Sequence, residues 1–482
     1  YNTDATFDFD NKNLKLAYEG KEDEIIKNIE AGNVSMTTGS SLIRGSAALF
    51  GVKAKLQFGK LTATALVSQQ NSESQTVNTR GGAQTTKFYI TCDKYDQNRN
   101  FFLSHFFRDN YDQWCSRLPL ISSGVNITRI EVWITNKRGN FNEARKLVAF
   151  QDVGENRRIS NTTLWHGDLS FNNPSNNSNN LLSDIKTQFP DARDITMVST
   201  AFEPLKAMGF EGGKDYEKIE GARLLSSSEY TLNSALGYIQ LKTTLNSDET
   251  LAVAYQYTYG GQTYQVGEFS GDVVETGQSL YVKMLKATTT LTTQPMWDLM
   301  MKNIYSLGAY SVQKQNFKLN IKYLSDTTGT ELPYLTAGKN NGKMLLQVMN
   351  LDRLDANNEP NIDGRFDYIE GYTVNSSNGK VIFPVVAPFG EHLAKQFDDP
   401  VLAKQYCYFE LYDTTITAAQ QIQDKNKFVL EGEYQASSGN VIKLNAMNVP
   451  RGSVVVTAGG VTLTENSDYT VDYNMGTVTI TK

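Results

Sequence analysis

The chain is poor in cysteine and histidine, and it has no long apolar run. Its three cysteines, Cys92, Cys115 and Cys407, stand far apart among 482 residues, which excludes a disulfide framework. Either Cys92 pairs with Cys115 in an oxidising compartment, or the thiols are free and buried. No apolar run approaches the roughly 18 residues of a transmembrane helix. A transmembrane barrel would leave no such run either.

Sequence patterns of enzymes and metal sites are also missing. The histidines at positions 105, 166 and 392 show no HxxxH spacing and no cluster with cysteine, which argues against zinc. There is no GxSxG and no P-loop, and no pair of carboxylates can be named for a glycosidase. We therefore expect that the protein is not an enzyme.

An excess of basic charge is absent as well. The 46 basic and 52 acidic residues give a net charge of −6, which argues against a nucleic-acid partner. Aromatic residues are plentiful, with 25 Tyr and 23 Phe, as in a β-rich surface protein or a β-barrel. The chain opens at Tyr1 without a signal peptide, so we expect a processed or excised piece.

The most regular pattern lies in residues 50–69, where apolar and polar residues alternate around Gly59-Lys60. This period of two predicts a β-hairpin with a type II′ turn. Arms of this length reach across an outer-membrane apolar band of about 25 Å. An amphipathic hairpin half-buried in a soluble sheet fits the same pattern, so both interpretations stay open at this point. The apolar face consists of Phe50, Val52, Ala54, Leu56, Phe58, Leu61, Ala63, Ala65 and Val67, and the polar face of Lys53, Lys55, Gln57, Thr62 and Thr64.

The rest of the chain is predicted to be mainly β with a few short helices, a β-rich α+β fold. The helix around His105 is rich in aromatic residues and is interpreted as a docking face. The Asn/Ser-rich stretch 172–180 is predicted to be a surface loop, and 71–83 a polar loop. Strands are expected over 5–9, 14–18, 33–44, 127–135 and 344–351, and helices over 22–31, from Pro295 towards Gly308, and over 414–424.

A short repeat occurs three times from Tyr230 onwards. Tyr-Thr-apolar-Asn/Asp begins at Tyr230, Tyr372 and Tyr469, and a glycine follows seven residues after each tyrosine. Asn or Asp opens turns and Gly accepts a positive φ, so each copy predicts a hairpin. We expect three domains: 1–80 with the hairpin 50–69, 81–250 ending in the first repeat, and 251–482 with the repeats 372–381 and 469–478.

A cluster of oxygen-bearing side chains lies between residues 352 and 367. Such side chains bind Ca²⁺, but Pro360 stands where an EF-hand beginning at Asp355 needs glycine. An acidic, turn-rich loop is the alternative, and no other cofactor is expected. The calcium candidates are Asp352, Asp355, Asn357 and Asp363, with Glu359 and Asp367 nearby.

Several long stretches resemble the SprA family, also called Sov, the outer-membrane translocon of type IX secretion in Bacteroidota. Beside the hairpin, the resemblance is carried by Gly45–Lys53, Asn126–Trp133, Asn303–Tyr310, Gln347–Leu354, Asp363–Gly371 and Phe383–Gly390. The resemblance implies a segment of a very large outer-membrane β-barrel with soluble cap or inserted modules. That barrel moves folded cargo proteins to the cell surface and serves gliding motility in many members.

The resemblance also implies a role for the hairpin and a set of partners. The apolar face of residues 50–67 would face lipid, and the polar face would face the lumen. The implied partners are the remaining barrel segments, a PorV-type barrel, a periplasmic plug protein, cargo with a C-terminal signal domain, and outer-membrane lipid, with no nucleic acid. The alternative from another class is a soluble cell-surface adhesin of β-sandwich modules, in which the acidic loop binds Ca²⁺.

Overall fold

The structure, a computed structural model, describes residues 15–19, 25–34, 49–58, 61–68, 85–136, 144–168, 173–272, 277–436, 441–444, 449, 452–465, 467–473 and 476–480. The fold is mainly β with short helices, as the sequence predicted. The chain forms two compact units: Tyr1–Gly82 with Ser438–Lys482 is unit 1, and Ala83–Ser437 is unit 2. Unit 2 is therefore an insertion in the sequence of unit 1. None of the described helices is long and apolar enough to cross a membrane.

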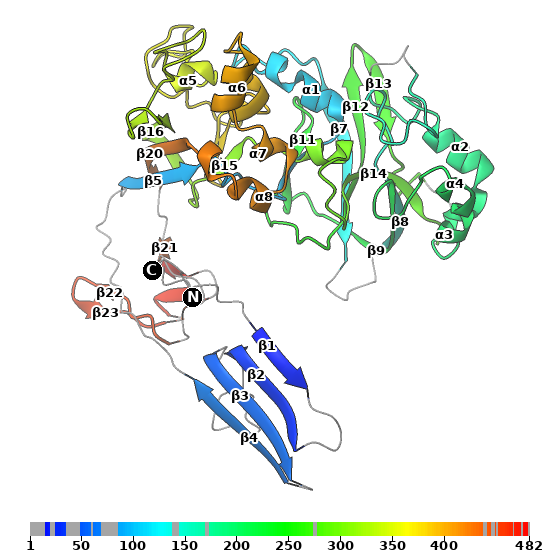
Figure 1. Cartoon of the computed structure of the whole chain (residues 1–482), viewed down its shortest axis with the longest axis horizontal. Helices are drawn as coiled ribbons and strands as arrows, with labels where there is room; N and C mark the ends of the chain where they lie inside the picture. Colours follow the sequence, from blue (N-terminus) through cyan, green and yellow to red (C-terminus); the bar gives the residue numbers. More distant parts are fainter. Residues whose placement is uncertain are drawn as a thin grey trace. The chain divides into compact units, whose positions relative to one another are not determined.

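Unit 1 contains an antiparallel sheet whose strands follow one another in chain order (Figure 1). The pairing of its third and fourth strands runs to Phe58 opposite Leu61, which confirms the predicted hairpin. The turn residues Gly59 and Lys60 lie outside the described residues, so the turn type stays a prediction. The strands are β1 (Lys15–Glu19), β2 (Ile26–Val34), β3 (Leu49–Phe58) and β4 (Leu61–Ser68).

The predicted helix over 22–31 is wrong, because β2 pairs with β1 on one side and β3 on the other. Ile29 stands opposite Ala54, and Ala31 stands opposite Val52, so β2 continues the apolar pattern of β3. Two neighbouring strands outweigh a local helix preference. β1 confirms the strand predicted over 14–18, whereas 5–9, most of 33–44 and all of 71–83 lie outside the described residues.

Five strands of unit 2 close into a ring. β7 pairs with both β9 and β12, β12 with β14, and β9 with β8, while β14 and β8 close the ring as a parallel pair. β7 confirms the strand predicted over 127–135. Strands from both sides of residue 250, where we expected a domain boundary, share this sheet. The members are β7 (Asn126–Thr135), β8 (Arg145–Phe150), β9 (Tyr216–Leu224), β12 (Leu251–Tyr259) and β14 (Leu280–Lys286), with β13 (Gln262–Val266) paired to β12.

Helix α1 (His105–Trp114) confirms the predicted aromatic helix, but its interpretation as a docking face is wrong. Phe107 and Tyr111 are fully buried in the core of the same chain. The ring of Phe107 meets those of Tyr255 and Tyr257 edge-on, with centroids 5.9 and 5.6 Å apart. The aromatic residues therefore anchor α1 to strand β12 of the ring, and the surface of α1 that remains open is polar.

A second sheet of unit 2 has the order β17, β16, β20, β5. Its strand β5 (Thr85–Thr91) is antiparallel to β20 (Phe428–Ala436), with Thr85 opposite Gln435. The side-chain amide of Gln435 donates through Nε2 to Oγ1 of Thr85 at 3.2 Å. The described part of unit 2 thus begins and ends on two adjacent strands (Figure 1). The other members are β16 (Val312–Leu324) and β17 (Glu331–Leu332).

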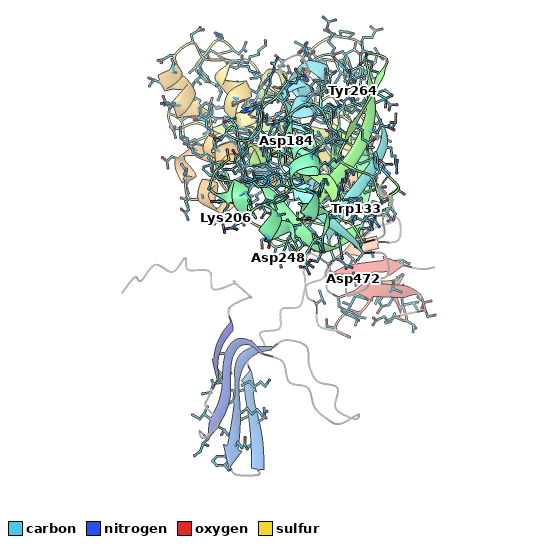
Figure 2. The ribbon with its side chains drawn as sticks, turned by 90° about the vertical axis from the view of Figure 1, so that its right-hand side faces the viewer. Trp133, Asp184, Lys206, Asp248, Tyr264 and Asp472 are labelled. Atoms are coloured by element: carbon cyan, nitrogen blue, oxygen red, sulfur yellow. The ribbon has the colours of Figure 1, made fainter. Side chains whose placement is uncertain are left out.

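All three repeats form the predicted hairpins. In each, a four-residue loop ends in a glycine with positive φ, which is +65° at Gly237, +60° at Gly379 and +60° at Gly476. Figure 2 labels Asp472, the last residue before the third loop. The strands are β10 (Tyr230–Asn233) with β11 (Tyr238–Leu241), β18 (Val374–Asn375) with β19 (Lys380–Ile382), and β24 (Tyr469–Asp472) with β25 (Thr477–Ile480).

Two predictions for the middle of the chain need correction. The expected strand over 344–351 is the short helix α5 (Leu345–Val348), and Asn350 just beyond it has a φ of +60°. The amide of Leu351 donates to the carbonyl of Leu346 at 2.8 Å, a Schellman closure. The helix expected from Pro295 towards Gly308 is the 3-10 turn η2 (Pro295–Leu299), because the chain then enters β15 (Ile304–Ser306).

The remaining elements are short, and α8 confirms the helix predicted over 414–424. They are β6 (Asn100–Phe102), α2 (Leu181–Gln188), η1 (Pro190–Arg193), α3 (Val198–Ala201), α4 (Glu203–Lys206), η3 (Pro388–His392), α6 (Pro400–Tyr406), α7 (Glu410–Asp413), α8 (Ile416–Gln420), η4 (Gln423–Lys425), β21 (Val441–Lys443), β22 (Thr457–Ala458) and β23 (Val461–Thr462).

Candidate functional site

The β1–β4 sheet of unit 1 carries an apolar face. Residues directly opposite in an antiparallel pair share a face, and the register aligns Ala31, Val52 and Val67 across three strands. Val52 is 49%, Phe58 52% and Val67 76% exposed, so the described part of unit 1 leaves these side chains uncovered. Figure 2 shows side chains projecting from the sheet. The described members are Ile29, Ala31, Val52, Ala54, Leu56, Phe58, Ala63, Ala65 and Val67.

The opposite face of this sheet is polar and basic. Lys55 stands opposite Thr64, and Lys53 and Gln57 alternate with the apolar residues of β3. Lys55 and Gln57 are exposed, and Lys53 is half-buried. The side chains of Phe50, Leu61 and Thr62, which the sequence also assigned to these faces, lie outside the described residues. The arrangement presents a sheet with one apolar and one hydrated surface.

Unit 2 contains a buried charge cluster that the sequence did not reveal. Oε1 of Glu155 lies 2.7 Å from Nζ of Lys283, and Oε2 lies 3.0 Å from Nδ1 of His105. Nε2 of His105 lies 2.8 Å from the carbonyl oxygen of Pro295. Lys283 lies on β14, His105 on α1, and Glu155 on the segment after β8. No local pattern connects residues so far apart in the chain, and so the cluster escaped prediction.

The pKa values of two neighbouring carboxylates, Glu155 and Asp152, are shifted in opposite directions. Burial by itself raises the pKa of Glu155, but the charges and hydrogen bonds of His105 and Lys283 lower it to about 2. Burial raises the pKa of Asp152 to about 6, although the amides of Ser160 and Asn161 donate to its carboxylate. Glu155, His105 and Lys283 are thus buried side chains that pair with one another in the core of unit 2.

The Asn/Ser-rich stretch 172–180 supports this core, so its prediction as a surface loop is wrong. Ser178 is fully buried and Asn179 is 7% exposed. Nδ2 of Asn179 donates to the carbonyls of Asp152 and Glu155, at 2.7 Å each. Asparagine amides here satisfy buried backbone groups, which composition alone cannot distinguish from solvated turns.

The carboxylates of the acidic loop accept hydrogen bonds from backbone amides of the same loop. The carboxylate of Asp352 accepts from the amides of Asp363 and Gly364 at 3.2 and 3.1 Å. That of Asp355 accepts from the amide of Asn357 at 2.8 Å. Within the described residues, no group of three or more His, Cys, Asp or Glu side chains is placed to hold a metal ion. The carboxylates instead close the turns of the loop, as Asp side chains commonly do.

The other two histidines and the three cysteines differ in exposure. His392 bonds through Nε2 to the carbonyl of Val348 at 2.7 Å, and His166 is exposed. Cys92, Cys115 and Cys407 are free and buried, which decides between the two possibilities that the sequence left open.

The comparisons with known proteins identify one family. The model of a family described as motility related/secretion protein, the SprA N-terminal family, matches residues 1–258. The match covers unit 1's β1–β4 sheet and most of the ring in unit 2. The comparison with curated proteins finds no match. Because the family model covers more than half of the 482 residues, the chain belongs to the SprA family of motility-related and secretion proteins.

Proposed function

We propose that this chain is a segment of the outer-membrane protein-conducting channel of type IX secretion. In this proposal β1–β4 are strands of the barrel wall, and unit 2 is an inserted soluble module. The family description names motility and secretion rather than a catalysed reaction, and we propose no enzymatic role.

The observation that carries the proposal is the two-sided sheet of unit 1. In unit 2, apolar strand residues such as Val132 and Val253 are fully buried, whereas in unit 1 Val67 is 76% exposed. Soluble proteins rarely leave a continuous apolar sheet face uncovered. A barrel strand alternates between lipid and a polar lumen, and β3, with ten residues, has the length of such a strand. In this proposal, lipid covers the apolar face of the sheet.

The experiment compares a lysine on each face of β3 in the protein as its native cells make it. Leu56→Lys places a charge on the apolar face, which destabilises a barrel by about 2–4 kcal/mol near the bilayer midplane. Gln57→Lys places the same charge one residue away on the polar face. We expect Leu56→Lys to abolish outer-membrane assembly and cargo secretion, and Gln57→Lys to preserve both. Membrane fractions extracted with carbonate and urea, followed by immunodetection, report assembly.

Equal assembly of the two variants would show that the apolar face does not meet lipid. Release of the unmodified protein by carbonate would have the same meaning and would favour a surface adhesin. The implied partners are part of this proposal: a PorV-type barrel, a periplasmic plug and cargo with a C-terminal signal domain. Co-purification of the Gln57→Lys protein with such partners, and its loss for Leu56→Lys, would link assembly to secretion.

A further inference from the structure

A cavity of about 550 Å³ opens in unit 2 between α1 and the segment 385–395. This volume lies within the range of small-ligand sites, roughly 300–1,000 Å³. Helix α1 contributes charged side chains to one wall, and the backbone and side chains of 385–387 contribute an apolar strip to the other. The residues that line it belong to unit 2, so the cavity concerns a different part of the chain from the membrane proposal.

Both walls of the cavity are fixed in place. The carboxylate of Asp112 accepts from the amide of Val386 at 2.7 Å, and the hydroxyl of Tyr111 donates to the carbonyl of Phe383 at 3.1 Å. The segment then makes the short turn η3, which is kinked at Gly390 with φ −112° and ψ −112°. A side chain at Gly390 would approach the ring of Tyr412 to 2.8 Å. The absence of a side chain at Gly390 therefore lets this segment bend against Tyr412.

Most of the charges in the cavity wall are already paired. Arg158 contacts Asp109 at 3.1 Å and Asp298 at 3.3 Å. Arg108 contacts the same two carboxylates at 3.1 and 3.9 Å. These four residues form a network that neutralises itself. The ammonium of Lys395 lies 3.7 Å from the carboxylate of Asp112, which already accepts a backbone amide.

Glu391 is the exception. It is exposed at the cavity, and among the described residues it makes no ion pair. Beside it, Nε2 of His392 bonds to the carbonyl of Val348, so that Nδ1 of the neutral ring is an acceptor. Burial lowers the pKa of His392, which keeps the ring neutral near pH 7. Asn350 adds an amide that can both donate and accept. The cavity therefore offers one unmatched negative charge and polar groups suited to a peptide unit.

We propose that this cavity binds a lysine or arginine side chain of an extended polypeptide segment. The aliphatic part of the side chain lies along Val385, Val386 and Ala387, because long basic side chains cover apolar surface while the charged end stays solvated. The cation pairs with Glu391, and the amide of Asn350 and Nδ1 of His392 bond the neighbouring peptide groups. The proposal concerns unit 2 and holds whether or not unit 1 lies in a membrane.

The experiment titrates acetylated, amidated pentapeptides into the 482-residue chain. One peptide has a central lysine between glycines, a second has norleucine at that position, and butylamine serves as a free cation. Calorimetry is expected to show binding of the lysine peptide, and about tenfold weaker binding of the norleucine peptide and of butylamine. Glu391→Gln is expected to lower the affinity for the lysine peptide by about tenfold, because a charge-assisted hydrogen bond is lost.

The matched control is Glu359→Gln, an exposed carboxylate in the acidic loop that does not line the cavity. It is expected to leave peptide affinity unchanged. Unchanged thermal midpoints would show that both variants fold. Equal affinities for the lysine and norleucine peptides, no saturation at millimolar concentration, or an unaltered affinity in Glu391→Gln would each overturn the proposal. Butylamine binding as tightly as the lysine peptide would overturn its polypeptide part.

Discussion

Glu155 and Lys283 form an ion pair with a 2.7 Å separation, although the side chain of Lys283 is fully buried and that of Glu155 is only 4% exposed. The pair joins strand β14 to the segment that follows β8. Nζ of Lys283 also donates to the carbonyl of Gln151, so its donors meet oxygen atoms inside the core. A buried pair of this kind stabilises little against an apolar replacement, but its disruption is costly.

Removal of one partner is therefore the first prediction. Glu155→Gln leaves Lys283 and His105 buried without their counter-charge, and we expect a loss of about 3–5 kcal/mol in the free energy of unfolding. Urea unfolding followed by tryptophan fluorescence measures this loss. All four tryptophans lie in unit 2, so the signal reports that unit alone. The exposed Glu359→Gln is expected to change stability by less than about 0.5 kcal/mol.

The two carboxylates predict a stability that depends on pH in opposite senses. The pKa of Asp152 is raised from 3.8 to about 6, so its contribution is full below pH 3.8 and is lost as the pH rises through 6. The pKa of Glu155 is lowered from 4.5 to about 2, so its contribution is full above pH 4.5 and is lost as the pH falls towards 2.

Urea unfolding between pH 3 and 7 separates the two effects. In Asp152→Asn, the decline of stability between pH 4 and 6 is expected to become shallower than in the unmodified protein. In Glu155→Gln, the decline below pH 4.5 is expected to become shallower. Identical pH profiles for the unmodified protein and Asp152→Asn would contradict the assignment of a raised pKa to that residue.

A comparison of two glycines separates the energetic cost of a positive φ from the cost of a steric clash. Gly371 and Gly379 both have positive φ, at +79° and +60°. A Cβ on Gly371 would meet nothing within 4 Å, whereas one on Gly379 would lie 2.2 Å from the carbonyl oxygen of Ala309. We expect Gly371→Ala to cost about 1–2 kcal/mol from conformation alone. Gly379→Ala should cost clearly more in the same urea assay, and equal costs would mean that the hairpin shifts freely.

The thiols predict a chemical signature. Burial raises the pKa of each cysteine, to about 12 for Cys407. Because the thiolate is the nucleophile, we expect no reaction with a disulfide reagent at pH 8 in the folded chain. In urea, all three thiols should react. A folded chain with one reactive thiol, or an unfolded chain with only one, would contradict the buried, unpaired state of Cys92 and Cys115.

Local chemistry explains what the sequence could predict. The three Tyr-Thr hairpins were predictable because Asn233, Asn375 and Asp472 open their loops and glycine closes them within seven residues of the tyrosine. The β3–β4 hairpin was predictable from another local signal, the alternation of its residues around Gly59-Lys60. Residues 344–351 carry a local signal as well, because Asn350 favours the positive φ that follows α5, but their apolar run predicts a strand.

Tertiary contacts explain what the sequence could not predict. β2 became a strand only because β1 and β3 flank it. The cavity draws Arg108 from α1, Arg158 from another segment and Glu391 from η3, and no spacing in the chain relates them. The faces of the unit 1 sheet were predictable as patterns, but the exposure of Val52 and Val67 required the structure.

The adjacent strands β5 and β20 have a mechanical consequence. Thr85 and Gln435 stand opposite each other where the chain enters and leaves unit 2. Tension between the two connections would pull both strands from the same end, opening their hydrogen bonds one after another. A zipper of this kind yields at low force, whereas strands pulled from opposite ends share the load. Unit 2 is thus attached by a connection that separates under strain before the ring of β7, β8, β9, β12 and β14 is deformed.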